Sequence, residues 1–139
     1  MTGAVITATS SSNAQQLTAE HRAKAIPTAI NADEVHARRG RLLDADIMIG
    51  IGPSGFILPV RGGRLDDLEP ATRLLRPWVF AIRADAATWL QHWENPPRAG
   101  WHDIFALSKR GLLTMEGNLV PLMQHLQFVK DVLAAPRTP

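Results

Sequence analysis

Residues 78–94, WVFAIRADAATWLQHWE, place a strand directly before a helix. The run from Trp78 to Arg83 is rich in aromatic and aliphatic residues, which is typical of a buried strand. Asp85 is a residue type that caps helices, because its carboxylate accepts hydrogen bonds from backbone N–H groups of the first turn. The helix is expected to end at about Glu94, since two prolines follow and a proline cannot continue a helix. This stretch therefore predicts a strand that leads into a helix packed on the same sheet.

Working outward, apolar periodicity predicts further strands and helices on both sides of this stretch. Strands are expected at 47–51, 56–60 and 112–116. Helices are expected at 32–43, 102–110 and 121–135, with Asn31 and Glu34 resembling a capping box before the first of them. Pro59 falls within the second strand and favours an edge or a bulge there. Together these elements predict an α+β fold, in which helices cover one curved, mostly antiparallel sheet of about five strands.

The length of 139 residues fits a single domain, which is expected over residues 17–135. Residues 1–16 are mostly Thr, Ser, Ala, Asn and Gln, a composition that predicts a disordered N-terminal tail. Residues 136–139 are expected to form a short C-terminal tail. No basic segment precedes an apolar run near the N-terminus, and no apolar run approaches the roughly 20 residues of a membrane span. A cytoplasmic protein without an integral membrane segment is therefore expected.

The composition excludes several classes of function. Cysteine is absent, which excludes disulfide scaffolds, thiol catalysis and cysteine-based zinc sites. Fifteen Lys and Arg oppose thirteen Asp and Glu, and this net charge of +2 is too small to predict a nucleic-acid surface. Arg38, Arg39 and Arg41 do cluster in the sequence. A self-compensated surface is nevertheless predicted, because four carboxylates bracket them: Asp33, Glu34, Asp44 and Asp46.

Residues that could carry out catalysis are sparse. The five histidines include no pair at i, i+4 on one predicted helix, so neither a metal nor a cofactor is expected. His102 and Asp103 are the best acid–base candidates, but sequence neighbours on a helix do not face each other, and Asp103 also fits a helix cap. Glu116 lies in a predicted strand, where a solvent-facing or cross-strand paired carboxylate is the simpler interpretation. No catalytic residue is therefore expected.

Bulky apolar side chains are concentrated in the C-terminal half of the chain. The last predicted helix carries a wide apolar stripe, and Trp89 and Trp93 lie four residues apart on the helix that follows Asp85. Such residues fill the core of most proteins, but flat aromatic and pliable methionine side chains also line adaptable apolar pockets. The residues expected to contact an apolar ligand are Trp89, Trp93, Phe105, Met115, Leu122, Met123 and Leu126.

Two segments, FAIRADAATW at 80–89 and GLLTMEGN at 111–118, resemble the sterol-carrier-protein-like lipid-transfer family. Over about residues 46–135, the order of strand, capped helix, helical segment, short strand ending in Gly-Asn and long apolar helix is similar to the order in that family. Residues 100–107, GWHDIFAL, are most similar to a bacterial branch in which such domains accompany hydrolases. The family's small-residue segment between the middle helices is replaced here by residues 95–99, so the resemblance carries over no preference for sterols.

The resemblance implies an apolar tunnel between the sheet and the helices. The ligands that it implies are sterols, fatty acids, acyl thioesters and phospholipids, bound or transferred without catalysis. Two alternatives stay open. One is a protein-interaction or dimerisation module accessory to a hydrolase, with a homodimer as its possible form. The other is a small isomerase or hydrolase that uses His102, Asp103 or Glu116.

Overall fold

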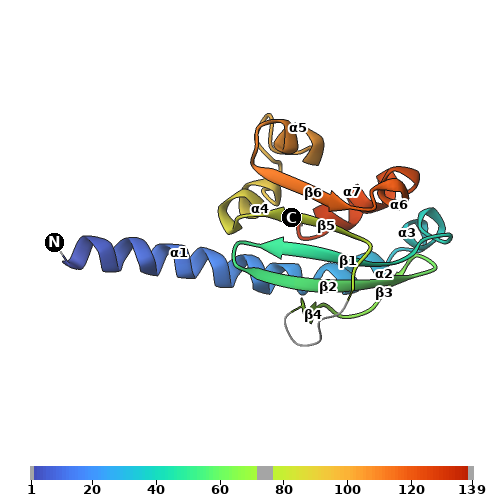
Figure 1. Cartoon of the computed structure of the whole chain (residues 1–139), viewed down its shortest axis with the longest axis horizontal. Coiled ribbons are helices and arrows are strands. Elements are labelled where there is room, and N and C mark those ends of the chain that lie inside the picture. The colour runs from blue at the N-terminus through green and yellow to red at the C-terminus, as the bar shows by residue number, and fades with distance from the viewer. Residues whose placement is uncertain (1, 72–76, 138–139) are drawn as a thin grey trace.

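The structure is a computed structural model, which describes residues 2–71 and 77–137, residues 2–11 by their backbone alone. Its helices are α1 (Thr2–Ala23), α2 (Ile26–Asn31), α3 (Glu34–Arg39), α4 (Ala86–His92), α5 (Ile104–Lys109), α6 (Val120–Gln124) and α7 (Leu126–Ala134). Its strands are β1 (Asp44–Ile51), β2 (Ser54–Arg61), β3 (Arg64–Leu65), β4 (Glu69–Pro70), β5 (Phe80–Ala84) and β6 (Leu113–Gly117). Figure 1 shows these elements around one sheet, with the N-terminal part of α1 extending from one end.

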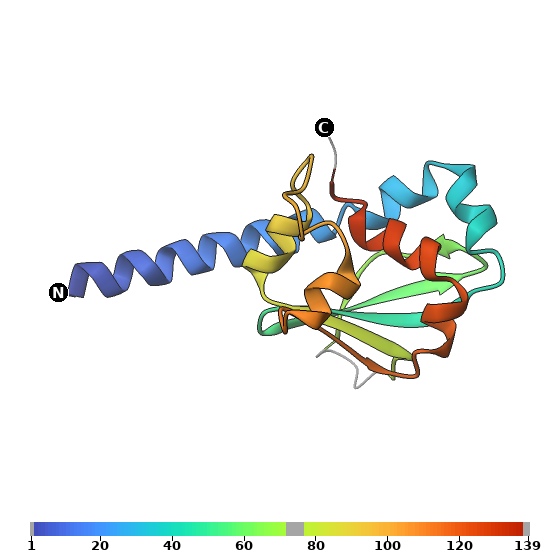
Figure 2. The same cartoon turned by 90° about the horizontal axis from the view of Figure 1, so that it is seen from above.

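The strands form a single sheet in the order β3-β2-β1-β5-β6, with β4 also paired to β2. Neighbouring strands are antiparallel apart from β1 and β5, which run parallel with Ile49 opposite Ile82. The α+β fold and the mostly antiparallel sheet predicted from the sequence are confirmed. Helices lie over one face of this sheet, as Figure 2 shows from above. Because β5 leads directly into α4 and β6 leads into α6, the sheet sets the positions of both helices.

The main core lies between the sheet and the helices. Alternate residues of β1, Ile47, Ile49 and Ile51, face this core and are fully buried. The opposite face of the sheet carries a smaller cluster of Met48, Ile57 and Ala81, against which Ala71 and Trp78 pack. The sequence predicted a half-buried strand at 47–51. The structure buries both of its faces, because Ala71 and Trp78 pack against the second face.

Pro59 occupies a position at which the sheet loses no hydrogen bond. Its carbonyl accepts from the N–H of Asp66, so that the polar backbone atoms of Pro59 face the outer side of β2 rather than β1. The backbone N–H and C=O of one strand residue point the same way, so the missing proline N–H also falls on that outer side. The predicted edge or bulge at Pro59 is wrong, because β2 pairs with β1 in a continuous register on one side and with β3 and β4 on the other.

Several predicted helix boundaries hold because the capping chemistry is local. The Asp85 carboxylate accepts from the N–H of Thr88 at 2.8 Å and starts α4. The Asp103 carboxylate accepts from the N–H of Phe105 at 3.0 Å and starts α5. Each bond satisfies an N–H group that the helix itself leaves without a partner.

The predicted helix at 32–43 is wrong in its cap and its length. Asp33, not Asn31, accepts from the first turn of α3, and this helix ends at Arg39. Asn31 instead pairs with the edge strand β3, donating to the carbonyl of Leu65 at 2.7 Å and accepting from its N–H at 3.0 Å. The side-chain amide of Asn31 contains both a donor and an acceptor. It can therefore pair with the free N–H and C=O of Leu65 on the edge strand, 34 residues away in the sequence.

The predicted single helix at 121–135 is divided into α6 and α7. The break falls at His125, whose φ of −122° and ψ of 38° are not helical. The backbone N–H and the ring Nδ1 of His125 both lie 3.1 Å from the carbonyl of Pro121, so this residue closes α6. Its own carbonyl accepts from Val129 and begins α7.

The backbone of residues 2–23 is one helix, which differs from the disorder predicted for residues 1–16. Residues 12–15 are exposed, whereas Ala19 and Ala23 are fully buried in the main core. Between them, Gln16 Nε2 donates to the carbonyl of Ile51 at 2.6 Å. The helix is therefore attached to the domain from Gln16 onward.

His92, in the last turn of α4, is a buried histidine whose surroundings lower its pKa. Burial is the largest cause that lowers its pKa below the ordinary value near 6.5, and the neighbouring Arg137 guanidinium lowers it further. A hydrogen bond of 2.8 Å from ring Nδ1 to the carbonyl of Trp101 opposes this shift. Arg137 also donates to the carbonyl of His92, so the C-terminal residues are attached to the end of α4.

Deleting residues 2–12 is expected to leave the melting temperature within a few degrees of that of the full chain. Extending the deletion through Gln16 should lower the free energy of unfolding by about 1 kcal/mol, because the bond to Ile51 is lost. Gln16→Ala in the full chain is the matched control and should show the same loss. Urea titration followed by circular dichroism measures all three. A loss above about 3 kcal/mol on deleting residues 2–12 would contradict the assignment of the domain to residue 17 onward.

Folding stability is expected to fall as the pH drops below about 6.5. The unfolded chain protonates His92 at a higher pH than the folded chain does, so the contribution of neutral His92 is complete above the unfolded pKa and is lost below it. The slope contributed by this residue is at most about 1.4 kcal/mol per pH unit. His92→Asn, which keeps a donor for the Trp101 carbonyl, should flatten the dependence below about pH 6.5. The exposed His102→Asn is the control, and equal slopes in both variants would show that His92 is not responsible.

Candidate functional site

Apolar side chains are left partly or largely exposed on β6, α5, α6 and the first turn of α7. Val120 and Met123, three residues apart on α6, are 59% and 55% exposed. With Leu119 and Gln124 they line an open groove of about 400 Å³. Exposed large apolar side chains that gather in one place commonly mark a binding surface. The apolar surface is defined here by these two exposed residues and by four half-buried side chains that pack on the main core: Phe105, Met115, Leu119 and Leu126.

The end of β6 fixes the start of α6. Gly117 has a φ of 92°, and a Cβ at this position would lie 2.7 Å from the carbonyl oxygen of Val79. Only glycine therefore fits this close turn. The next residue, Asn118, donates its N–H to the carbonyl of Val79 at 2.9 Å and accepts from the N–H of Val120 at 3.1 Å. Leu122 is the residue of α6 that is fully buried, so it anchors the helix while its neighbours stay exposed.

The side chain of Phe105, a residue of α5, contacts α7. The Lys130 ammonium is 5.4 Å from the centroid of its ring and 3.7 Å from the carboxylate of Asp103. Leu126 is four residues before Lys130 on α7, and residues at this spacing lie on the same side of a helix. The side of α7 that carries Leu126 therefore faces α5. Met115 is opposite Ile82 in the sheet and shares its core-facing side.

The structure brings some of the predicted ligand residues to this surface and keeps others in the core. Phe105, Met115, Met123 and Leu126 belong to the apolar surface, and Leu122 lies beneath it. Trp89 and Trp93 are fully buried, stack with ring centroids 5.4 Å apart, and donate their indole N–H groups to backbone carbonyls. Their contact with a ligand stays a prediction.

Of the acid–base candidates, His102 and Asp103 line one hollow of about 260 Å³ together with Lys130 and Asp131, whereas Glu116 lies elsewhere. Glu116 is opposite Ala81, on the face of the sheet away from the main core, where it pairs with Arg83. Asp103 caps α5 and lies near Lys130 of α7, and the neighbouring His102 is exposed. In the part of the chain that the structure describes, no group of three or more His, Cys, Asp or Glu residues could hold a metal ion.

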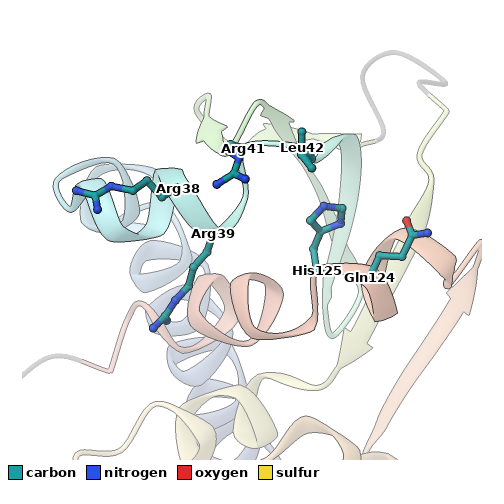
Figure 3. A pocket seen from close by; sticks show the side chains of 6 residues that line it. All are labelled: Arg38, Arg39, Arg41, Leu42, Gln124 and His125. Atoms are coloured by element: carbon teal, nitrogen blue, oxygen red, sulfur yellow. The ribbon is translucent and has the colours of Figure 1, made fainter.

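A second hollow, which the sequence did not predict as a site, adjoins the apolar surface. It has a volume of about 460 Å³ and is lined by Arg38, Arg39, Arg41, Leu42, Gln124 and His125. Figure 3 shows that these side chains come from α3 and the following turn on one side and from the α6–α7 junction on the other. Gln124 also lines the apolar groove, so the two hollows are neighbours. Three arginines within four residues were the sequence signal for this basic hollow.

The prediction that these arginines are neutralised by the carboxylates next to them in sequence is wrong. Arg39 pairs with Asp131 of α7 at 2.7 Å, which is 92 residues away. Among the described residues, the side chains of Arg38 and Arg41 have no hydrogen-bond or ion-pair partner. The four bracketing carboxylates bond elsewhere: Asp33 to Val35, Glu34 to Arg64, Asp44 to Gly62 and Asp46 to Arg61.

Comparison with known proteins finds no similar sequence but several similar solved structures. No protein-family model matches the chain, and no curated protein sequence does. Among the described residues, no helix is both long and apolar enough to cross a bilayer. Solved structures, by contrast, are similar over most of the chain.

One of these is the crystal structure of sterol carrier protein 2, at a TM-score of 0.65 and 18% identity, covering 84% of this chain and 94% of that one. A solution structure of TT1886 from Thermus thermophilus, described as possibly a sterol carrier protein, gives 0.58 and 19%, covering 86% and 89%. The ubiquinone synthesis protein UbiJ-SCP2 gives 0.57 and 16%, covering 88% and 94%. The strand order, the covering helices and these similarities agree: the chain has the fold of sterol carrier protein 2.

Proposed function

We propose that this protein binds and transfers an apolar small molecule of the lipid class, without chemical conversion. The ligand is seated beneath α6, between the core-facing side of β6 and the facing sides of α5 and α7. The observation that carries this proposal is the apolar groove at α6, where Val120 and Met123 are more than half exposed and line one hollow with Leu119. The shared fold supports it, because one protein with this fold is named for carrying sterols.

Burial of an alkyl chain supplies enough free energy for this function. Each buried methylene contributes about 0.8 kcal/mol, so a ten-carbon chain contributes about 8 kcal/mol before the costs of association. Phe105, Met115, Leu119 and Leu126 present only hydrocarbon, ring or thioether surface to such a chain. Contacts of this kind do not depend on direction, so the proposed specificity is broad: sterols, fatty acids, acyl thioesters and phospholipids are all candidates.

The short helix α6 is the proposed movable cover of the site. It has five residues, begins after the Gly117 turn and ends at the His125 break. Its fully buried anchor is Leu122, and apolar contact allows a helix to shift more easily than a hydrogen-bonded network does. Displacement of α6 would open the space between β6 and α7 to a ligand. A longer unbroken helix, as predicted from the sequence, could not move this segment independently.

Purified protein is expected to retain or take up lipid. Native mass spectrometry should show a bound species, and organic extraction followed by mass analysis should identify its class. Protein stripped of lipid should then bind a fluorescent fatty acid saturably, below the micelle limit of that probe. Stripped protein that binds neither fatty acid, sterol nor phospholipid would contradict the proposal. If the apparent mass of that protein then rises with its concentration, the interaction-module alternative is favoured.

Enlarging residues of the site should block ligand without unfolding the protein. Leu126→Trp fills the proposed space between α5 and α7, and Met123→Trp covers the groove on α6. Both positions are partly open, so the free energy of unfolding should fall by less than about 1 kcal/mol. Binding of the fluorescent fatty acid should be lost in Leu126→Trp and weakened in Met123→Trp. Chemical denaturation and fluorescence titration measure the two quantities separately.

Val129→Trp is the matched control on the same helix. Val129 is fully buried, and enlarging a packed residue costs about 1–3 kcal/mol or more through strain. If Leu126→Trp destabilises the protein as much as Val129→Trp does, there is no space beside Leu126 and the site is packed core.

A further inference from the structure

We propose that the surface formed by the α3–β1 turn and α6 docks onto anionic lipid bilayers. This docking surface consists of Arg38 and Arg41, the exposed leucine Leu42 between α3 and β1, and the exposed residues Val120 and Met123 of α6. The basic hollow lies between the two elements, with His125 in its wall (Figure 3). The proposal concerns attachment to a membrane and holds whether or not the protein carries a ligand.

The charge of this surface is unbalanced. Arg38 and Arg41 are exposed, and the structure as described gives neither side chain an anionic partner. The nearby carboxylate of Asp131 is already bonded, because it lies 2.7 Å from Arg39 and 3.5 Å from the His36 ring and accepts from Gln127. Two uncompensated guanidinium groups three residues apart in the chain attract an anionic lipid surface, and each matches a phosphate group in geometry.

Apolar side chains project next to these charges. Leu42 is 78% exposed, the largest fraction among the exposed large apolar residues described. An exposed leucine close in sequence to arginines suits the interface of a bilayer. There the lipid headgroups can pair with the guanidinium groups, and the acyl chains can bury the leucine side chain. A nucleic acid offers the same phosphates but no apolar layer, so it would leave Leu42, Val120 and Met123 in water. The combination therefore favours a bilayer.

The turn that presents Leu42 is held from three sides. Leu43 is fully buried, donates to the carbonyl of Gly40 at 2.8 Å and accepts from the N–H of Gly62 at 3.0 Å. A Cβ on Gly40 would lie 2.6 Å from the Phe128 ring, so the turn sits directly on α7. A Cβ on Gly63 would lie 2.5 Å from the carbonyl oxygen of Ala37. The exposed Leu42 is thus fixed by its neighbours, and docking requires little ordering of the chain.

The position of the surface suits a protein that exchanges lipid with a membrane. Gln124 lines both the basic hollow and the apolar groove, so lipid headgroups at the arginines would lie beside the proposed ligand entrance. Both α3 and α6 lie at the end of the molecule opposite the N-terminal part of α1 (Figures 1 and 2). The N-terminal helix therefore points away from a membrane docked on this surface.

Flotation with vesicles of phosphatidylcholine alone, or with about 30% phosphatidylglycerol added, tests the proposal. The stripped full chain should float with the anionic vesicles at low salt and much less with the neutral ones. Near an anionic surface each arginine contributes about fivefold to the binding constant, so Arg38→Ala with Arg41→Ala should weaken binding by about 25-fold. Leu42→Ser should weaken it by about tenfold, since a leucine side chain no longer enters the interface.

Two matched controls separate docking from general electrostatic attraction. Arg98→Ala with Lys109→Ala removes the same charge from exposed positions outside the docking surface and should leave binding within about twofold. Deletion of residues 2–12 should also leave binding unchanged. The proposal is overturned if the control pair weakens binding as much as the Arg38 and Arg41 pair does, if the deletion abolishes it, or if single-stranded RNA binds through these arginines while the vesicles do not.

The depth to which residue 42 enters the bilayer can be measured independently of vesicle flotation. Leu42→Trp should show a blue shift and quenching by brominated lipid on adding anionic vesicles, beyond any change in the wild-type chain under the same conditions. An unchanged spectrum with vesicles bound would show that Leu42 stays in water and would overturn insertion. Leu126→Trp should still float, so a lipid-binding defect and a docking defect are distinguishable.

Discussion

Two indole N–H groups on one short helix hold the elements of this protein together. Trp89 Nε1 donates to the carbonyl of Gly50 in β1 at 2.8 Å, and Trp93 Nε1 donates to the carbonyl of Leu133 in α7 at 2.7 Å. Arg22 of α1 lies over the Trp93 ring at 5.6 Å and donates to the carbonyls of Trp93 and Pro136. Both tryptophans are buried, and a buried donor without a partner costs about 1–3 kcal/mol, so α1, α7 and the sheet are all fixed relative to α4.

The two ends of the helical layer differ in how firmly their helices are attached to the rest of the protein. Around α4, directional hydrogen bonds and fully buried aromatic rings fix each element. Around α6, the attachment is one buried leucine, a hydrogen bond from the N–H of Val120 to the Asn118 side chain and apolar contacts at the rim of the core. Hydrophobic contacts tolerate small displacements, whereas a hydrogen bond weakens steeply as its geometry changes. The proposed ligand site and docking surface both lie at the end that can adjust.

The basic hollow and the apolar groove form an amphipathic pair that neither the charge nor the hydrophobicity of the chain reveals alone. A lipid leaving a bilayer must keep its headgroup solvated or paired while its chain moves into apolar surroundings. In the proposed docking, Arg38 and Arg41 would supply the first environment and the α6 groove the second, and Gln124 lines both hollows. The small net charge of +2 conceals this local asymmetry, because the four carboxylates that bracket these arginines in sequence bond to other groups.

The sequence by itself determined the features that depend on near neighbours. Alternation at Ile47, Ile49 and Ile51 and the caps at Asp85 and Asp103 follow from side-chain period and capping chemistry. Only the tertiary structure decided what residues far apart in the chain do to one another. Arg39 pairs with Asp131, Asn31 bonds to β3, both indoles find carbonyls about 40 residues away, and His125 divides the last helix. No local pattern specifies these partners, because each is selected by the packing of the whole chain.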